Sequence, residues 1–302
     1  MIICTELSPV IPQAAALSLL TNNVLGTLTC LMQTVVLRMM RSSSVLHDTE
    51  RRTPKMQHSY YRPLPYLLPP IPNISLPNSG PPAQQSYVHE PFIEICDDAR
   101  FSVRMQYAVE GRLNSTKKCY VRQTVYEKLC FAHKNLPSGF KFLIYDAWRP
   151  FDLQKELYED LSRSIIESYG YQDRSDKEQV ELISKFIAPP VKDPDNLPTH
   201  TTGGAIDLSL IGPDGEELDM GTKFDEMNTK SGVNAFEGTA NELVKNNRRL
   251  LFHTMLKAGF TNLPSEWWHY DYGDRYWARF NRVPVMYGGV FSEREIEITK
   301  TK

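Results

Sequence analysis

The chain has 302 residues, which is enough for one large domain or two small ones. Hydrophobic residues make up 41% and charged residues 23%, an ordinary composition for a soluble globular protein. The formal net charge of -2 shows no basic excess, so we expect no nucleic-acid partner. The five cysteines are odd in number and form no C-x-x-C pair, which argues against a disulfide framework and favours reduced thiols in the cytoplasm.

Residues 1–85 are predicted to form a largely irregular, proline-rich N-terminal arm. Its apolar stretch, 9–40, is interrupted by Asn22 and Thr27 and falls short of the ~20 clean apolar residues of a membrane span. No basic residue precedes this stretch, so a secretory signal is a poor match, while a weak anchor or targeting segment stays open. Proline dominates residues 62–82, and because it blocks helices and central strands, an extended arm that wraps the surface is predicted.

Residues 86–302 are predicted to form a single α+β domain with a central antiparallel sheet flanked by helices. Strands are predicted where β-branched and aromatic residues concentrate, at 140–148, 205–211 and 266–272. Helices are predicted where apolar residues recur at helical spacing, in the segments marked by Val121, Val125 and Leu129, by Leu153, Leu157 and Leu161, by Val180, Ile183 and Ile187, and over 239–258 with Gly259 as the stop.

The first segment with chemical potential is THTTGGAIDLSL, residues 199–210. The pair Gly203-Gly204 permits a sharp turn, so a histidine in the loop, His200, and an aspartate on the following strand, Asp207, can converge. Imidazole nitrogen and carboxylate oxygen both suit zinc, at about 2.0–2.2 Å. Taken alone, the pair is explained better as a surface histidine and an aspartate at a strand edge.

The second segment is SEWWHYDY, residues 265–272, in which His269 can supply a third ligand and Glu266 can stand beside the metal's water. Residues three apart on an ideal strand face opposite ways, so the segment must twist or bulge, or Glu266 must come from a loop. An equally good interpretation is a strand whose tryptophans pack in the core while both polar residues are solvated.

The third segment is YDAWRP, residues 145–150, where Arg149 sits at the change from a strand to a proline-stopped turn. A guanidinium fixed there could polarise a scissile carbonyl and stabilise an oxyanion. The alternative is a structural ion pair with Asp146 or Asp152. The chain has no H-E-x-x-H, G-x-S-x-G or P-loop motif, so zincin, serine-hydrolase and P-loop functions lack support.

Taken together and in this order, the segments resemble the D-alanyl-D-alanine dipeptidases of the VanX type, in the LAS group of zinc peptidases. The resemblance rests on H-x-x-G-x-A-x-D from His200 to Asp207, E-W-W-H-Y at 266–270 and D-x-x-R-P from Asp146 to Pro150. The stretches MGTKFDEM and NNRRLLFHTMLKAGF are also similar, and the whole match extends from about residue 92 to 275.

The resemblance implies a fold of the hedgehog/DD-peptidase type, one zinc ion per chain and a small D,D-dipeptide as substrate. It also implies hydrolysis of D-alanyl-D-alanine by a metal-activated water, with Asp225 near the substrate's amino group. The implied site consists of the zinc ligands His200, Asp207 and His269, the general base Glu266, the transition-state stabiliser Arg149 and the substrate contacts Tyr107 and Asp225.

One position departs from the family pattern and keeps other functions open. Two residues before the first ligand the family usually has a serine that binds the substrate carboxylate, whereas this chain has Pro198, without a hydroxyl or an N–H. A zinc carboxypeptidase, or another LAS-group peptidase with a different small peptide, is therefore the second hypothesis. A zinc-bound interaction domain without turnover is the third, and Glu266 and Arg149 argue against it because binding zinc needs neither. The sequence leaves the native metal, the physiological role and the oligomeric state open.

Overall fold

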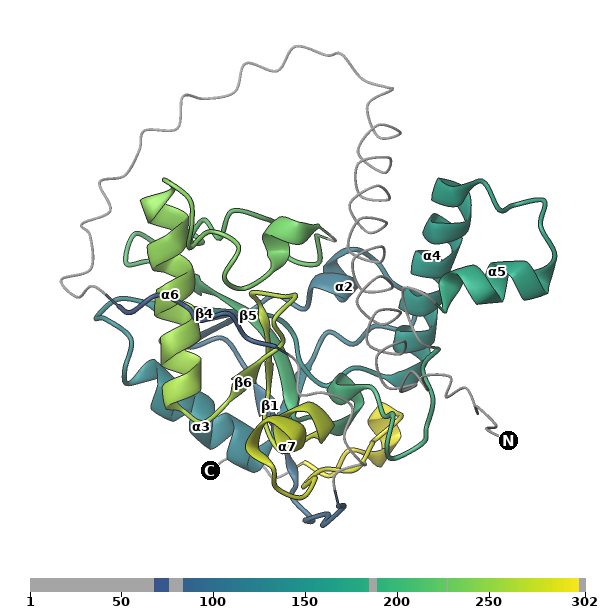
Figure 1. Ribbon diagram of the computed structural model, residues 1–302. Helices are drawn as coiled ribbons and strands as arrows, with labels where there is room; N and C mark the ends of the chain where they lie inside the picture. Colours follow the sequence, from purple (N-terminus) through teal and green to yellow (C-terminus); the bar gives the residue numbers. More distant parts are fainter. Residues whose placement is uncertain (1–67, 76–83, 185–188, 227, 299–302) are drawn as a thin grey trace, which may run out of the picture. The chain divides into compact units, whose positions relative to one another are not determined.

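The structure is a computed structural model that describes residues 68–75, 84–184, 189–226 and 228–298 (Figure 1). Among these, residues 165–184 belong to one compact unit and all the others to a second, larger unit. The apolar stretch at 9–40 lies outside the described residues. Within the described part of the chain, no helix is long and apolar enough to cross a membrane.

The larger unit is built on a five-stranded sheet with the strand order β2-β4-β5-β7-β6. Its strands are β2 (Phe101–Val103), β4 (Lys141–Asp146), β5 (Ala205–Ile211), β6 (Thr261–Asn262) and β7 (His269–Asp271). The strands β1 (Phe92–Ile95) and β3 (Cys119–Arg122) form a separate antiparallel pair. The predicted antiparallel sheet is confirmed with one difference, because β2 runs parallel to β4.

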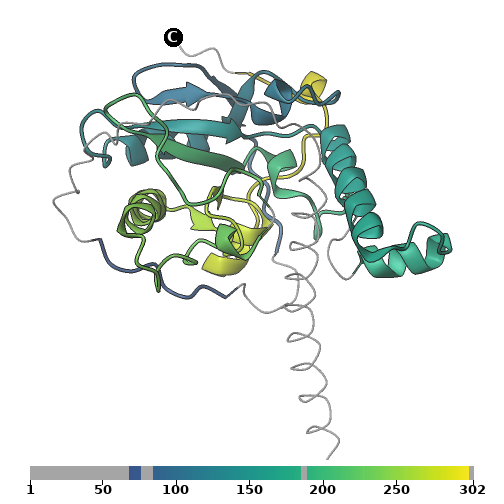
Figure 2. The ribbon, with the colours of Figure 1, turned by 90° about the horizontal axis from the view of Figure 1, so that it is seen from above.

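Helices accompany the strands and confirm the α+β class. The larger unit contains α2 (Gln106–Val109), α3 (Gln123–His133), most of α4 (Phe151–Tyr169), α6 (Glu242–Lys257) and α7 (Arg275–Asn281), with short 3₁₀ turns η1 (Thr199–Thr202), η2 (Thr229–Ser231) and η3 (Glu293–Glu295). The smaller unit contains the end of α4 and α5 (Asp176–Ile183). Helices α3 and α6 contact each other, and in the view from above α6 is seen along its axis beside the strands (Figure 2).

The main core lies between the central strands and helices α3 and α6. Alternate residues of β5, namely Ile206, Leu208 and Leu210, are fully buried in it, together with Leu129 of α3 and Leu251 of α6. Successive side chains of a strand point to opposite faces, so the residues between them, Asp207 among them, face the other side of the sheet. The hydrophobic pattern of β5 therefore fixes where its aspartate points.

Two element predictions were wrong in their bounds. Val121 lies in β3, and the helix begins after it, because Arg122 has an extended backbone (φ −62°, ψ 151°) as the helix N-cap. The strand predicted over 266–272 is only β7, so Glu266 precedes it in a turn. The third predicted helix ends at Ile183, and Ile187 lies outside the described residues.

The described piece of the proline-rich segment, residues 68–75, has neither helix nor strand. Ile71 is buried against Val233 and Phe252, and Arg249 of α6 donates a hydrogen bond from Nη1 to the carbonyl of Leu68 at 3.2 Å. Backbone contacts of this kind tie the segment to α6. The boundary between arm and domain near residue 86 stays a prediction.

Candidate active site

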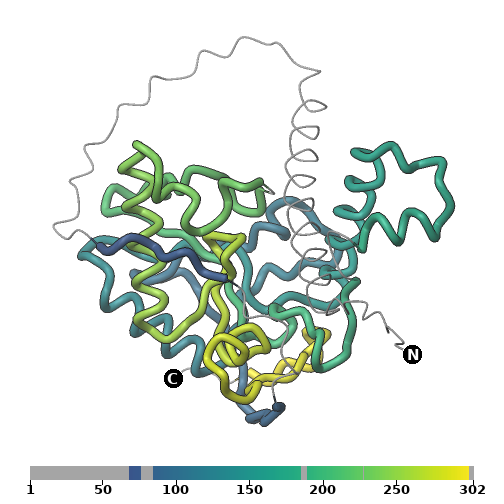
Figure 3. The backbone as a smooth tube through the Cα atoms, in the orientation of Figure 1, coloured from purple at the N-terminus to yellow at the C-terminus, as the bar shows by residue number. Residues whose placement is uncertain are grey.

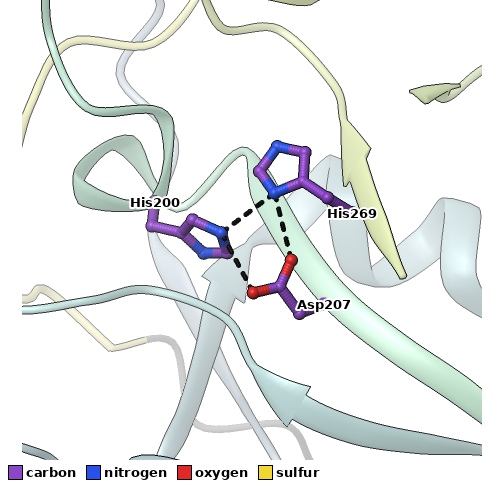
Figure 4. Close-up of side chains that lie close together, drawn as sticks. All are labelled: His200, Asp207 and His269. Carbon is purple, nitrogen blue, oxygen red and sulfur yellow. Dashed lines mark hydrogen bonds and ion pairs between the residues drawn. The ribbon is translucent and has the colours of Figure 1, made fainter. Parts of the chain in front are cut away.

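Three side chains of different elements converge at one buried point (Figure 4). His200 Nε2 lies 3.1 Å from His269 Nδ1 and 3.3 Å from Asp207 Oδ2. His269 Nδ1 lies 3.0 Å from Asp207 Oδ1. The donor atoms thus form a small triangle of two imidazole nitrogens and one carboxylate.

The fold brings these residues together through strand register and one glycine turn. Asp207 on β5 is paired directly with His269 on β7, so their side chains leave neighbouring strands at the same level. Figure 3 traces the backbone of the described residues in the colours of the sequence. His200 comes from η1, which ends at Gly203 with φ +74°. A Cβ atom on Gly204 would lie 2.4 Å from the carbonyl oxygen of Tyr272. Only glycine fits this turn, which returns the chain from His200 into β5.

Outer hydrogen bonds fix how the two imidazoles face the centre. His200 Nδ1 lies 2.7 Å from the carbonyl oxygen of Ala147, which can only accept, so Nδ1 carries the proton and Nε2 the lone pair. His269 Nε2 lies 2.8 Å from Asp271 Oδ1 and donates to it. Burial opposes ionisation of Asp271, yet the interaction with His269 lowers its pKa. Histidines that bind metals are oriented in this way by a carbonyl or a carboxylate.

The centre of the triangle requires positive charge. Burial lowers the pKa of His269, but Asp271 and Asp207 outweigh this and raise it well above its usual value, which favours a proton on Nδ1. A divalent metal can take the place of that proton. With zinc–ligand distances of about 2.0–2.1 Å, the edges of a coordination tetrahedron measure roughly 3.3 Å. The separations of 3.0–3.3 Å between the donors therefore fit such an ion.

Glu266 lies at the edge of this centre, with Oε2 3.9 Å from His269 Nδ1. It stands in a turn before β7, where its backbone N–H donates to the carbonyl of Leu263 at 3.0 Å. The turn removes the difficulty that residues three apart on a strand face opposite ways. Solvent reaches 29% of the side chain, but crowding by protein raises its pKa to about 7, an increase that His269 offsets only in part. Such a carboxyl can both accept and release a proton near neutral pH.

Arg149 is buried and aimed by two hydrogen bonds. Its Nε donates to Asp146 Oδ2 and its Nη1 to Gln154 Oε1, each at 2.8 Å. Its Nη2 lies 3.6 Å from Asp207 Oδ2, and its guanidinium carbon lies 5.1 Å from the centroid of the Tyr107 ring. The ion pair with Asp146 considered from the sequence therefore exists. It also turns the free side of the guanidinium toward the three-residue centre.

Tyr107 and Asp225 form a second polar group beside Arg149. The Tyr107 hydroxyl donates to Asp225 Oδ2 at 3.1 Å, although 118 positions separate the two residues. Asp225 is exposed to solvent, yet the protein around its carboxyl raises its pKa to about 6, an effect that Arg149 only partly offsets. The Asp225 backbone has φ +58°, a conformation that non-glycine residues seldom adopt and that clusters at functional sites.

Sequence reasoning missed the residues that orient this site. Asp271 follows His269 by two positions, the spacing of side chains on one face of a strand, and this signal could have identified it. Asp274, the N-cap of α7, has its pKa raised well above the usual value by burial and by the neighbouring Asp271. Gln154 had no sequence signal, because only the turn at Pro150 brings it beside Arg149.

Comparisons with known proteins agree with this geometry. The family model described as "D-ala-D-ala dipeptidase" (Peptidase M15) matches residues 89–286. The chain is 30% identical over 190 residues to a D-alanyl-D-alanine dipeptidase of Synechocystis sp.. This aligned region covers 57% of this chain and 77% of the relative. It is 33% identical over 134 residues to one of Escherichia coli (44% and 56%) and 32% identical over 137 residues to one of Enterococcus faecium (44% and 62%).

The matched part makes the protein a metallopeptidase of dipeptidase type. More particularly, the chain belongs to the M15 peptidase family of D-ala-D-ala dipeptidases. The family resemblance inferred from the motifs is thereby confirmed, and a non-catalytic interaction domain loses its support. The roles of the individual site residues stay predictions.

Proposed function

We propose that the protein is a zinc-dependent D,D-dipeptidase that hydrolyses D-alanyl-D-alanine and holds one zinc ion through His200, Asp207 and His269. The observation that carries this proposal is the convergence of these three donors within 4.8 Å of one another, with Glu266 at the same centre. The names of the relatives, all D-alanyl-D-alanine dipeptidases, support the choice of substrate.

Glu266 acts as the general base in this proposal. Zinc, when bound, lowers the pKa of water and polarises the scissile carbonyl. Glu266 removes a proton from the attacking water and returns it to the leaving amine as the peptide C–N bond breaks. Burial raises the pKa of Glu266 to about 7 in the metal-free protein, and a divalent ion beside it would lower that pKa, so the carboxylate is ionised and able to accept the proton.

Arg149 stabilises the negative charge that develops on the carbonyl oxygen. Its Nε and Nη1 are occupied by Asp146 and Gln154, which leaves Nη2 directed toward the reacting centre. Because the guanidinium is held before the reaction starts, little reorganisation is needed in the transition state. Gln154 and Asp146 are positioning residues in this scheme.

Asp225 and Tyr107 bind the amino end of the dipeptide. The ammonium group of a dipeptide needs a carboxylate partner when binding removes it from water. Asp225 supplies this charge once it is ionised, and the Tyr107 hydroxyl fixes the orientation of its carboxylate.

A second candidate is a carboxypeptidase or a dipeptidase of the same group with a different small peptide. Pro198 favours it, because it is the N-cap of η1 and offers neither a hydroxyl nor an N–H to a substrate carboxylate. This candidate uses the same metal centre and the same base.

The test is release of D-alanine from D-alanyl-D-alanine by the full-length protein, with metal removed and with zinc restored. We expect zinc-dependent release, and loss of more than 95% of it in Glu266→Gln, roughly the scale of losing a general base, with zinc still bound. Asp152→Asn, which removes an exposed carboxylate paired with Lys155 at 3.0 Å, is the control. Zinc binding without release, followed by cleavage of another peptide in a panel of D,D-, L,D- and L,L-dipeptides and longer peptides, would favour the second candidate.

A cytoplasmic location is also part of the proposal. Cys96, Cys119 and Cys130 are all free thiols, as expected in a reducing compartment. Fractionation of cells that produce the full-length chain tests it, and recovery of the protein outside the cytoplasm would contradict it.

A further inference from the structure

Helix α6 carries a buried arginine that binds backbone instead of a carboxylate. Arg248 is 2% exposed, and its guanidinium donates from Nε to the carbonyl of Met220 at 2.7 Å. Its Nη1 donates to the carbonyl of Gly232 at 2.5 Å and its Nη2 to that of Lys230 at 2.8 Å. These three carbonyls flank residues 221–229, the segment that contains Asp225.

Burying the charged guanidinium of Arg248 is unfavourable unless its hydrogen bonds to the three carbonyls compensate for the loss of water. Burial lowers its pKa to about 10, and the nearby Tyr270 and Asp219 offset this only in part. The rings of Phe236 and Trp267 also lie against the guanidinium, with centroids 4.6 and 5.9 Å from its carbon. The planar fork of an arginine can serve three acceptors at once, which lysine cannot do. The geometry therefore indicates a clamp on the backbone.

The clamped segment is joined to the turn of the proposed base. The Trp267 backbone N–H donates to the carbonyl of Ser231 at 2.9 Å, and its indole N–H donates to Thr222 Oγ1 at 2.8 Å. Trp267 follows Glu266 directly in the sequence, and its ring lies beside the guanidinium of Arg248. Between these anchors lies Asp225, with its unfavourable φ of +58°. Such a conformation persists only when its surroundings hold it in place.

We propose that Arg248 is a positioning residue for substrate binding, which holds the backbone at Met220, Lys230 and Gly232 on either side of Asp225 so that the Asp225 carboxylate stays directed at the amino end of the substrate. This inference rests on the proposed role of Asp225. It adds that recognition of the substrate amine depends on a side chain that touches neither the substrate nor Asp225.

The test compares Arg248→Met, Arg248→Lys and the control Arg249→Met in the full-length protein. Arg249 is the neighbouring buried arginine, but it pairs with Glu237 and not with the segment. In Arg248→Met we expect hydrogen exchange of the amides within 221–231 to accelerate at least ~10-fold, while those of β5 are unchanged. The KM for D-alanyl-D-alanine should rise about 10-fold or more, kcat should fall less than about threefold, and bound zinc should stay the same. Arg248→Lys should lie between Arg248→Met and the unchanged protein.

A double-mutant cycle with Asp225→Asn separates positioning from general destabilisation. If Arg248 acts through Asp225, adding Arg248→Met to Asp225→Asn should change KM by less than about twofold. The proposal would be overturned if the two substitutions raised KM independently, so that their effects multiplied in the double variant. It would also be overturned if hydrogen exchange within 221–231 were unchanged in a folded Arg248→Met variant. If Arg248→Met fails to fold, Arg248→Lys decides by the same two readouts. If the unchanged protein does not cleave the dipeptide, the proposed function fails, whereas hydrogen exchange still decides whether the clamp exists.

Discussion

Replacing Asp271 with alanine should weaken zinc binding although Asp271 is not among the three donors. Its Oδ1 accepts the Nε2 proton of His269 at 2.8 Å and thereby keeps Nδ1 turned to the centre. The residue is 0% exposed, so water does not simply replace the lost acceptor. Loss of such an outer partner typically lowers metal affinity 10–100-fold, which corresponds to about 1.4–2.7 kcal/mol.

The assay is competition for zinc between the protein and a chromophoric chelator of known affinity. Zinc affinity of the unchanged protein should rise with pH, because the proton on His269 has to leave when the metal binds. Asp271→Asn serves as the matched variant, since its amide oxygen can still accept from Nε2, and it should lose less affinity than Asp271→Ala. Circular dichroism confirms that both variants fold. An affinity of Asp271→Ala within about twofold of the unchanged protein would refute this reasoning.

Three further outcomes are expected. Asp225→Asn should raise KM for the dipeptide. The folded protein raises the pKa of Asp225 from 3.8 to about 6, so ionisation of this residue destabilises the fold as pH rises from 3.8 to 6. In urea titrations over this pH range, Asp225→Asn should therefore lose less stability than the unchanged protein. Gly203→Ala should lower the free energy of unfolding by about 1–3 kcal/mol more than Gly111→Ala does in the same titrations. Both glycines have positive φ, but only at Gly203 would a Cβ clash, lying 2.3 Å from Phe92. Equal losses of stability in the two variants would contradict this. Removing the metal should lower the melting temperature, and zinc at about 100 times its Kd should restore roughly 2.7 kcal/mol; a shift without zinc specificity would argue against the site.

The sequence by itself determined the kinds of residues at the site and most of the elements that carry them. The two glycines between His200 and Asp207 permit a turn into a strand, and the composition of AIDLSLI predicts that strand. The bounds of β5 and the end of α6 follow from local patterns, with Gly259 at φ +89° just after the helix, whereas α6 begins at Glu242 and not at the predicted residue 239. Turns, strands and helix ends depend on residues that are neighbours in the sequence, so they can be predicted from the sequence alone.

Tertiary structure alone decided how these residues face one another. The register that sets Asp207 opposite His269, the turn that places Glu266 and the contact between Tyr107 and Asp225 all join parts of the chain far apart in sequence. No local pattern encodes such contacts, because they depend on which strands pair and how they pack. The same holds for the tautomers of the two histidines and for the carbonyls bound by Arg248, since hydrogen bonds to backbone leave no trace in residue identity.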